Sequence, residues 1–251
     1  MKKSFITITI MLFLTVISLL ETRKANASDT VENLVEVENS LDTEKIIQDL
    51  YNSIKGSDEK PNYKVFRKAL IGYYHLKASN KLSDKKDYLT IVDFSLSSNK
   101  ERLWIIDLKN KQILFYSLVA HGKNTGDEYA ANFSNLPNSF MSSIGFYVTG
   151  EIYHGKHGLS LRLDGQEKEF NSEARQRAVV MHGADYVSKD FIKKAGRLGR
   201  SLGCPAIPVE IHKEIITALS EKTCLFIYHP DKSYEEKSSF KNEGILAKIL
   251  F

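Results

Sequence analysis

Two side chains, those of His182 and Cys204, have the types and the settings that acyl-transfer chemistry requires. His182 follows the apolar run 178–181, which reads as a short buried strand. Cys204 follows Gly203, which lets the backbone approach a substrate closely, and precedes Pro205, which fixes the turn. A cysteine attacks a carbonyl as its thiolate, and an adjacent imidazole favours that ionised form. The intervening segment is long enough to fold back, so this pair predicts a nucleophile and its base.

The second cysteine, Cys224, offers a plainer interpretation, because two cysteines can form one disulfide. Cys224 begins the apolar run 224–228, where a thiol packs as a small hydrophobic group. Cys204 lies in a polar loop that contains a glycine and suits an exposed reactive group. These unlike settings favour a nucleophile at Cys204 over a disulfide.

The residues around the pair resemble a known family. The chain carries His182-Gly183 and then Ser201-Leu202-Gly203-Cys204, with further similar segments at residues 119–124, 145–150, 154–163 and 224–230. This ordered set resembles the catalytic signature of the L,D-transpeptidases of peptidoglycan, the YkuD-type fold, and most closely the murein L,D-transpeptidase catalytic domain. The resemblance extends over roughly residues 62–231. Leu202 departs from it, because many members of the superfamily have a histidine there, so no role is carried over to this side chain.

The resemblance implies a mechanism and a substrate. Cys204 would be the nucleophile, His182 its base, and the backbone carbonyl of Gly183 the group that orients the imidazole. The thiolate would attack the carbonyl of the L-centre before the terminal D-alanine of a tetrapeptide stem. Capture of the thioester by an amine of a second stem gives a 3-3 crosslink, whereas capture by water makes the protein an L,D-carboxypeptidase. A non-catalytic peptidoglycan-binding protein is an alternative of another class, and the resemblance also implies acylation by carbapenems, a class of β-lactam.

Other residues are candidates for supporting roles. The backbone N–H groups of Gly203 and Cys204 are candidates for an oxyanion hole, and Ser201 for support of the loop. The guanidinium of Arg200 has the geometry to bind a substrate carboxylate. Two histidines that precede a glycine, together with Arg200 and a tyrosine of the similar segment 145–150, are expected to bind substrate: His121, His154, Arg200 and Tyr147.

A zinc hydrolase is the third function class, because His121, His154 and His157 could join His182 and Cys204 in a zinc site. These residues have neither His-x-Glu nor Cys-x-x-Cys spacing and no acidic partner. The sequence therefore predicts no metal. It also contains no glycine-rich phosphate loop, so we expect neither a nucleotide nor another cofactor.

The first 27 residues have the order of an export signal. Lys2 and Lys3 precede the apolar run 5–20, and Ala25-Asn26-Ala27 matches a cleavage site. We predict cleavage after Ala27 and a location in the periplasm or cell envelope. An uncleaved anchor is the alternative, although a run of about 16 apolar residues is short of the roughly 20 that a spanning helix needs. The segment also carries much of the formal net charge of +4, so this charge does not indicate nucleic acid as a partner.

The remaining elements form the frame that must position the pair. We expect an acidic linker with a short helix over residues 28–60, and a second helix over residues 61–81, ahead of a β core at 88–231. The expected strands of this core cover residues 88–94, 102–108, 112–119, 145–149, 159–163, 178–182 and 223–228. Short helices are expected at 188–195 and 209–219. Many short strands with few helices predict a mainly β fold, a β-sandwich or a partly closed barrel, with an N-terminal helical pair. The catalytic domain would cover residues 61–231, and residues 232–251 would be a C-terminal tail.

Overall fold

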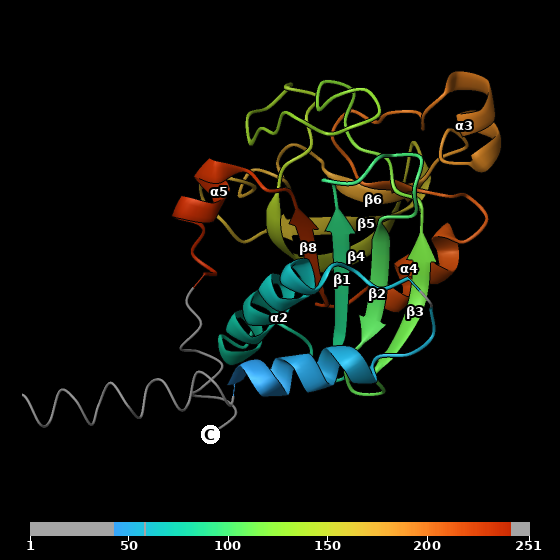
Figure 1. Ribbon diagram of the computed structural model, residues 1–251. Coiled ribbons are helices and arrows are strands. Elements are labelled where there is room, and N and C mark those ends of the chain that lie inside the picture. The colour runs from blue at the N-terminus through green and yellow to red at the C-terminus, as the bar shows by residue number, and fades with distance from the viewer. Residues whose placement is uncertain (1–42, 58, 242–251) are drawn as a thin grey trace, which may run out of the picture. The chain divides into compact units, whose positions relative to one another are not determined.

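The computed structural model describes residues 43–57 and 59–241 (Figure 1). The predicted export signal and the acidic stretch 28–40 lie outside the described residues. The chain divides into two units, Met1–Gln48 and Asp49–Phe251, and the second holds the whole sheet. A helix covers residues 43–53, and α2 covers Tyr63–Ala78, so both helices of the predicted N-terminal pair form.

All eight strands of the described chain belong to one mixed sheet, in the order β3-β2-β1-β8-β4-β5-β6-β7. This confirms the mainly β prediction. Two neighbouring pairs, β1 with β8 and β6 with β7, are parallel, and the others are antiparallel. The strands are β1 (Tyr88–Asp93), β2 (Leu103–Asp107), β3 (Gln112–Ser117), β4 (Gly145–Gly155), β5 (Gly158–Gly165), β6 (Val180–Gly183), β7 (Ala206–Ile207) and β8 (Cys224–Tyr228).

The two ends of the strand order meet just after β3. The Ala120 N–H donates to the carbonyl of Ala206 in β7 over 2.8 Å, and the Ala206 N–H donates back over 3.4 Å. A cluster of buried side chains that includes Leu118, Val187 and Leu198 packs around this seam. Of the two mainly β architectures expected, the partly closed barrel therefore describes the sheet. In Figure 1, β4, β5 and β6 run across the direction of β1, β2 and β3.

Helix α2 covers β1 and β8 (Figure 1), and an apolar stripe along the helix is buried. Phe66, Ala69 and Leu70 on this stripe are buried, as are β1 and β2 over nearly their whole length. Gly72 allows a close approach, because a Cβ atom there would lie 2.0 Å from the ring of Phe146 on β4. Burial of both sheet faces explains why β1 and β2 are continuous apolar runs.

Two elements near the candidate site differ in length from the predictions. β4 extends to Gly155 and β5 begins at Gly158, so these strands form a hairpin that is longer than the expected 145–149 and 159–163. The residues that extend the hairpin, 150–155 and 158, are half-buried or exposed, and for that reason the sequence pattern does not mark them as strand. The two helices in the second half are α3 (Lys189–Ala195), capped by Ser188, and α4 (His212–Leu219).

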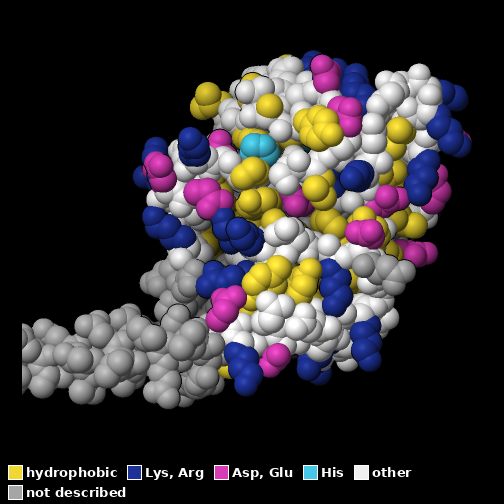
Figure 2. Space-filling view, in the orientation of Figure 1, with side chains coloured by type: hydrophobic (Ala, Val, Ile, Leu, Met, Phe, Trp, Pro, Cys, Tyr) yellow, Lys and Arg dark blue, Asp and Glu magenta, His cyan; other side chains and the backbone are white. Residues whose placement is uncertain are grey.

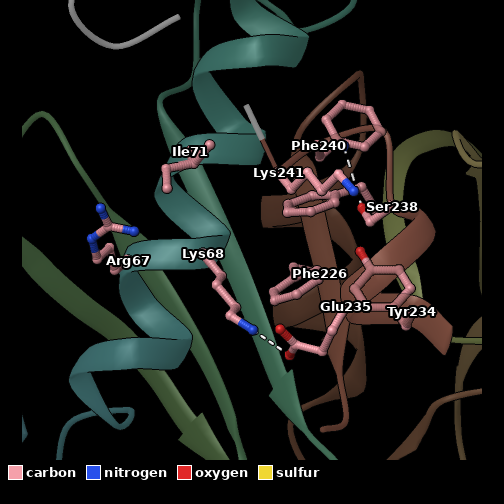
Figure 3. A pocket seen from close by; sticks show the side chains of 10 residues that line it. Arg67, Lys68, Ile71, Phe226, Tyr234, Glu235, Ser238, Phe240 and Lys241 are labelled. Atoms are coloured by element: carbon pink, nitrogen blue, oxygen red, sulfur yellow. Dashed lines mark hydrogen bonds and ion pairs between the residues drawn. The ribbon is translucent and has the colours of Figure 1, made fainter. Parts of the chain in front are cut away.

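Residues 232–241 of the predicted C-terminal tail pack against α2 and the sheet. Helix α5 covers Lys232–Lys237, and Lys68 on α2 forms an ion pair with Glu235 on α5 (Figure 3). Phe226 and Tyr234 line the cavity between these elements. The buried carboxylate of Glu167 accepts hydrogen bonds from Tyr234 Oη over 2.9 Å, Ser238 Oγ over 2.6 Å and the Phe146 N–H over 2.8 Å. The end of the described chain is thus fastened to β4.

We predict that Glu167→Ala lowers the free energy of unfolding by about 3 kcal/mol, because it leaves three buried donors without an acceptor. Urea unfolding followed by circular dichroism measures this loss. The matched control is Glu169→Ala, since Glu169 forms only an exposed ion pair with Lys237 over 3.5 Å, and we expect a change below about 1 kcal/mol. Equal losses in the two variants would contradict the role given to Glu167.

The surface carries both signs of charge. Figure 2 shows lysines, arginines and carboxylates interspersed over the face that it presents, with hydrophobic side chains between them. This mixture agrees with an ordinary solvated surface. Among the helices that the structure describes, none is long and apolar enough to span a bilayer.

Candidate functional site

The register of two parallel strands brings His182 and Cys204 to one place. β6 pairs with β7 so that His182 lies opposite Ala206, which puts Cys204 at the level of Val180. The Val180 N–H donates to Cys204 Sγ over 3.4 Å, and the thiol lies 3.8 Å from the carbonyl oxygen of Ala178. His182 and Cys204 line the same cavity, whose volume is about 350 Å³.

The ring of His182 is held from two sides. Its Nδ1 lies 2.9 Å from the backbone carbonyl oxygen of Gly183, so Nδ1 carries the proton and Nε2 is the basic nitrogen. His157, at the tip of the β4–β5 hairpin, stacks on this ring with centroids 4.3 Å apart and planes 18° apart. Burial lowers the pKa of His182, the hydrogen bond to Gly183 opposes this shift, and His157 adds to it. The imidazole is therefore neutral at pH 7 and able to accept a proton.

The thiol of Cys204 is partly exposed at the cavity. Burial raises its pKa, while the Val180 N–H and the positive charges of Arg177 and Lys156 oppose the shift. A thiol with a raised pKa is protonated at neutral pH, so it needs a base when it attacks. Cys224 is a free thiol as well, fully buried on β8 with a pKa raised by burial.

The loop before Cys204 is fixed by its own hydrogen bonds. Ser201 Oγ donates to the Cys204 carbonyl over 2.6 Å and accepts the Gly203 N–H over 3.0 Å. Gly203 has a φ of 123°, and a Cβ atom there would lie 2.7 Å from the Met141 carbonyl oxygen, so only glycine fits. Because the Gly203 N–H is already bound, the Cys204 N–H is the member of the predicted oxyanion pair that lacks a partner among the hydrogen bonds of the described chain.

Two of the four predicted substrate-binding residues are buried away from the cavity. His121 Nδ1 accepts from Arg102 Nη2 over 2.9 Å, and its Nε2 lies 3.3 Å from the Gly126 carbonyl oxygen. Burial, aided by Arg102, lowers the pKa of His121 to about 4, so this neutral ring supports the loop at Gly126. Tyr147 is fully buried and donates from Oη to the Ser143 carbonyl over 2.9 Å. Neither residue lines the cavity around Cys204.

The other two predicted residues lie closer to the site. Arg200 lines the cavity, but its Nη1 donates to the carbonyls of Lys123 and Gly126 over 3.1 Å and to Asp127 over 2.6 Å. Its guanidinium therefore already has a carboxylate partner, which competes with a substrate. His154 is exposed on the β4–β5 hairpin and is not among the residues that line the cavity.

The cavity contains residues that the sequence analysis did not select, and also His157, which it named only as a possible zinc ligand. Some come from the β4–β5 hairpin, some from the loop between β3 and β4, and two from the segments before and after β6: Tyr153, Lys156, His157, Asn138, Phe140, Arg177 and Tyr186. His157 carries the same signal as His121 and His154, because it also precedes a glycine. Arg177 lies only five residues before His182 in the sequence. None of the residues that line the cavity is an aspartate or glutamate.

The histidines and cysteines of the described residues do not gather as metal ligands. Within residues 43–57 and 59–241, no group of three or more His, Cys, Asp or Glu side chains is arranged to hold a metal ion. The three histidines have different surroundings. His121 supports the loop at Gly126, His154 is exposed on the surface, and His157 stacks on His182. The geometry of the site supports nucleophilic chemistry by a cysteine with a neutral histidine as base.

Comparison with known proteins gives a family match. A family model described as L,D-transpeptidase catalytic domain matches residues 57–228. The comparison with curated proteins found no match.

Several solved structures are similar at low sequence identity. They include an L,D-transpeptidase from Mycobacterium smegmatis, with 11% identity over 57% of this chain and 59% of that chain and a TM-score of 0.36. An L,D-transpeptidase in complex with imipenem has 12% identity over 57% and 59% and a TM-score of 0.36. An L,D-transpeptidase from Xylanimonas cellulosilytica has 11% identity over 73% and 91% and a TM-score of 0.33. The chain spans less than two thirds of the first two proteins, and these TM-scores are too low to assign a function or a site.

Proposed function

Because the family match at residues 57–228 covers more than half of its length, the chain belongs to the L,D-transpeptidase catalytic domain family, and we propose that it is an extracytoplasmic cysteine acyltransferase of peptidoglycan. The observation that carries this proposal is the shared cavity of Cys204 and His182, with the imidazole oriented by the Gly183 carbonyl. The export signal that the sequence predicts at residues 1–27 supports the location. The substrate would be a tetrapeptide stem, and the product a 3-3 crosslink.

The reaction proceeds in two acyl transfers. His182 Nε2 takes the Cys204 thiol proton while Sγ bonds to the carbonyl carbon of the L-centre. The tetrahedral intermediate then expels the D-alanine amine, which receives the proton from His182, and the thioester remains. An amine of a second stem attacks this thioester, His182 takes the proton of that amine, and the proton returns to Sγ as the new amide forms. The Cys204 N–H is the candidate backbone donor for the oxyanion in both transfers.

The resting charges of the pair fit this sequence. Burial raises the pKa of Cys204 and lowers that of His182, so thiol and imidazole are both neutral before substrate arrives. Neutral partners avoid the cost of two buried charges in the resting site. The ion pair forms as the thiol attacks, at the moment when the oxyanion also needs stabilisation. Around this pair, Lys156 and Arg177 give the cavity wall a positive character, which suits the carboxylates of a peptide stem.

Digestion of tetrapeptide muropeptides with the mature protein tests the proposal. Mass analysis is expected to find crosslinked dimers with loss of D-alanine. Tripeptide without dimers would assign water as the acceptor and the protein as an L,D-carboxypeptidase. Unchanged muropeptides with folded protein would contradict both reactions and favour a peptidoglycan-binding protein.

The stack of His157 on His182 predicts a pH effect. The pKa of His182 is lowered, so the basic form persists to more acidic pH, and the acid limb of kcat/KM is expected below pH 6.5. His157→Ala removes part of the burial and a like charge, so the pKa of His182 should rise and the acid limb should move to higher pH. His157→Phe keeps a stacked ring and should shift the limb less. Superimposable profiles for all three proteins would contradict this effect.

A further inference from the structure

Arg177 is a charged side chain of the cavity wall that four hydrogen bonds hold in place. It precedes β6 and is half-buried at the cavity wall. Its Nη1 donates to the Ser134 carbonyl over 2.7 Å and to Ser143 Oγ, and its Nη2 donates to the Met141 carbonyl over 2.7 Å and to Ser139 Oγ over 3.2 Å. A single guanidinium thus fastens the segment 134–143 at four points.

The segment 134–143 in turn braces the loop that carries Cys204. Ser142 Oγ donates to the Gly203 carbonyl over 3.3 Å and accepts the Gly122 N–H over 3.0 Å. A Cβ atom on Gly203 would lie 2.7 Å from the Met141 carbonyl oxygen and 3.5 Å from Arg177 Nη2. The guanidinium therefore lies directly against the backbone that precedes the nucleophile.

The charge of Arg177 is not neutralised by its partners. All four hydrogen-bond acceptors are neutral carbonyl or hydroxyl oxygens, and no ion pair of the described chain includes Arg177. The cavity wall has no aspartate or glutamate, whereas Arg200 at its rim pairs with Asp127. A net positive charge therefore faces the site from a half-buried position, where it is screened less than on the surface.

The other titratable groups around the thiol come from several segments. Tyr153, Lys156 and His157 lie on the β4–β5 hairpin, and His182 lies on β6. Tyr186 follows β6, and Arg200 lies in the loop before Cys204. Lys156 is an exposed cation that also favours the Cys204 thiolate. Tyr186 is neutral at pH 7, because burial raises its pKa to about 12. Arg177 is thus the cation that the fold itself holds in place next to Cys204.

We propose that Arg177 is a positioning residue that braces the nucleophile loop through the segment 134–143 and stabilises the Cys204 thiolate with its positive charge. This inference rests on the proposed function of Cys204 as the nucleophile. Two separate contributions follow from it. The planar guanidinium, with its several N–H donors, fixes the geometry of the loop. Its positive charge favours the thiolate form of Cys204.

Two variants separate these contributions. Arg177→Lys keeps the positive charge but loses the planar group of N–H donors. Arg177→Gln loses the charge and the guanidinium, and retains only an amide donor. The rate of alkylation of Cys204 by iodoacetamide against pH measures the thiol pKa without any peptidoglycan substrate. Muropeptide conversion measures turnover, and circular dichroism and melting measure the fold. The matched control is Arg175→Gln, because Arg175 lies two residues away, is itself exposed, and pairs with the carboxylates of Glu151 and Asp164 outside the cavity.

Arg177→Gln is expected to raise the thiol pKa by about one unit, which lowers the alkylation rate at neutral pH about tenfold. Arg177→Lys should keep the thiol pKa near that of the wild type while turnover falls at least about tenfold. Arg175→Gln should match the wild type in both. A wild-type alkylation profile for folded Arg177→Gln would overturn the electrostatic role, and wild-type turnover by Arg177→Lys would overturn the bracing role. If wild-type protein converts no muropeptide, the proposed function fails, yet the alkylation profiles still test the effect of Arg177 on Cys204.

Discussion

Cys204→Ala is expected to lower muropeptide conversion by at least about 10³-fold, because it removes the only nucleophile of the proposed mechanism. The same variant should form no covalent adduct with a carbapenem, which whole-protein mass spectrometry detects as an increase in mass. Cys204→Ser keeps the shape of the side chain but replaces the thiol by a hydroxyl that a single histidine activates poorly. We expect it to be inactive in both assays as well.

Cys224→Ala is the matched control for these variants. Cys224 is fully buried on β8, between β1 and β4, and its thiol does not line the cavity. Removal of its sulfur should lower stability modestly, by about 1 kcal/mol, and leave turnover and adduct formation intact. Rapid alkylation of the native protein should likewise modify Cys204 and spare Cys224. Muropeptide conversion at the wild-type rate by folded Cys204→Ala would refute the thioester mechanism.

The pair at the centre of the site could be predicted from local sequence alone. An apolar run that ends in His182 predicts a buried strand, and a glycine-bearing loop at Cys204 predicts a turn with an accessible thiol. The parallel pairing of β6 with β7 then brings the two together. The hydrogen bond from His182 Nδ1 to Gly183 involves adjacent residues, so it also depends only on local backbone geometry.

Other parts of the site depend on contacts between distant segments, which local patterns do not encode. His121 and His157 each precede a glycine, but Arg102, the residue before β2, binds the first, and the β4–β5 hairpin places the second against His182. The hairpin itself is longer than its apolar pattern indicates, because its tip is exposed and polar. Tyr147 lies in the interior because it belongs to the first five residues of β4, all of which are buried. In a sheet, a shift of one residue decides which face a side chain occupies.

The fold was predictable as a class but not as a topology. The short strands indicate a mainly β protein, yet the parallel pairing of β1 with β8 joins residues from the two ends of the core. Leu89, Ile91 and Phe226 of these two strands are buried. Because both faces of such strands are covered, apolar and polar residues do not alternate along them, and the sequence pattern does not show which strands pair. The closure of the sheet joins Ala120 and Ala206, whose small side chains pack in one cluster. These two residues meet only when the whole sheet has formed, so the local sequence does not predict their contact.

His182→Ala is expected to lower turnover by about 10²- to 10⁴-fold, the range of a lost general base. His182→Gln is the sharper variant, because its amide can still donate to the Gly183 carbonyl and fill the space under His157 without accepting the thiol proton. Both should be similarly inactive if proton transfer, and not ring packing, is what the imidazole contributes. Activity of His182→Gln near that of the wild type would assign His182 a structural role.

The double variant His182→Ala with Cys204→Ala tests whether the two residues act as one unit. In a shared mechanism, removal of either member disables the same step, so the two losses should not add, and the double variant should equal Cys204→Ala alone. The thiol of His182→Ala should still alkylate, since Cys204 ionises in part without its base, at a rate that rises toward its raised pKa. Losses in turnover that multiply in the double variant would mean that the imidazole and the thiol act in separate steps.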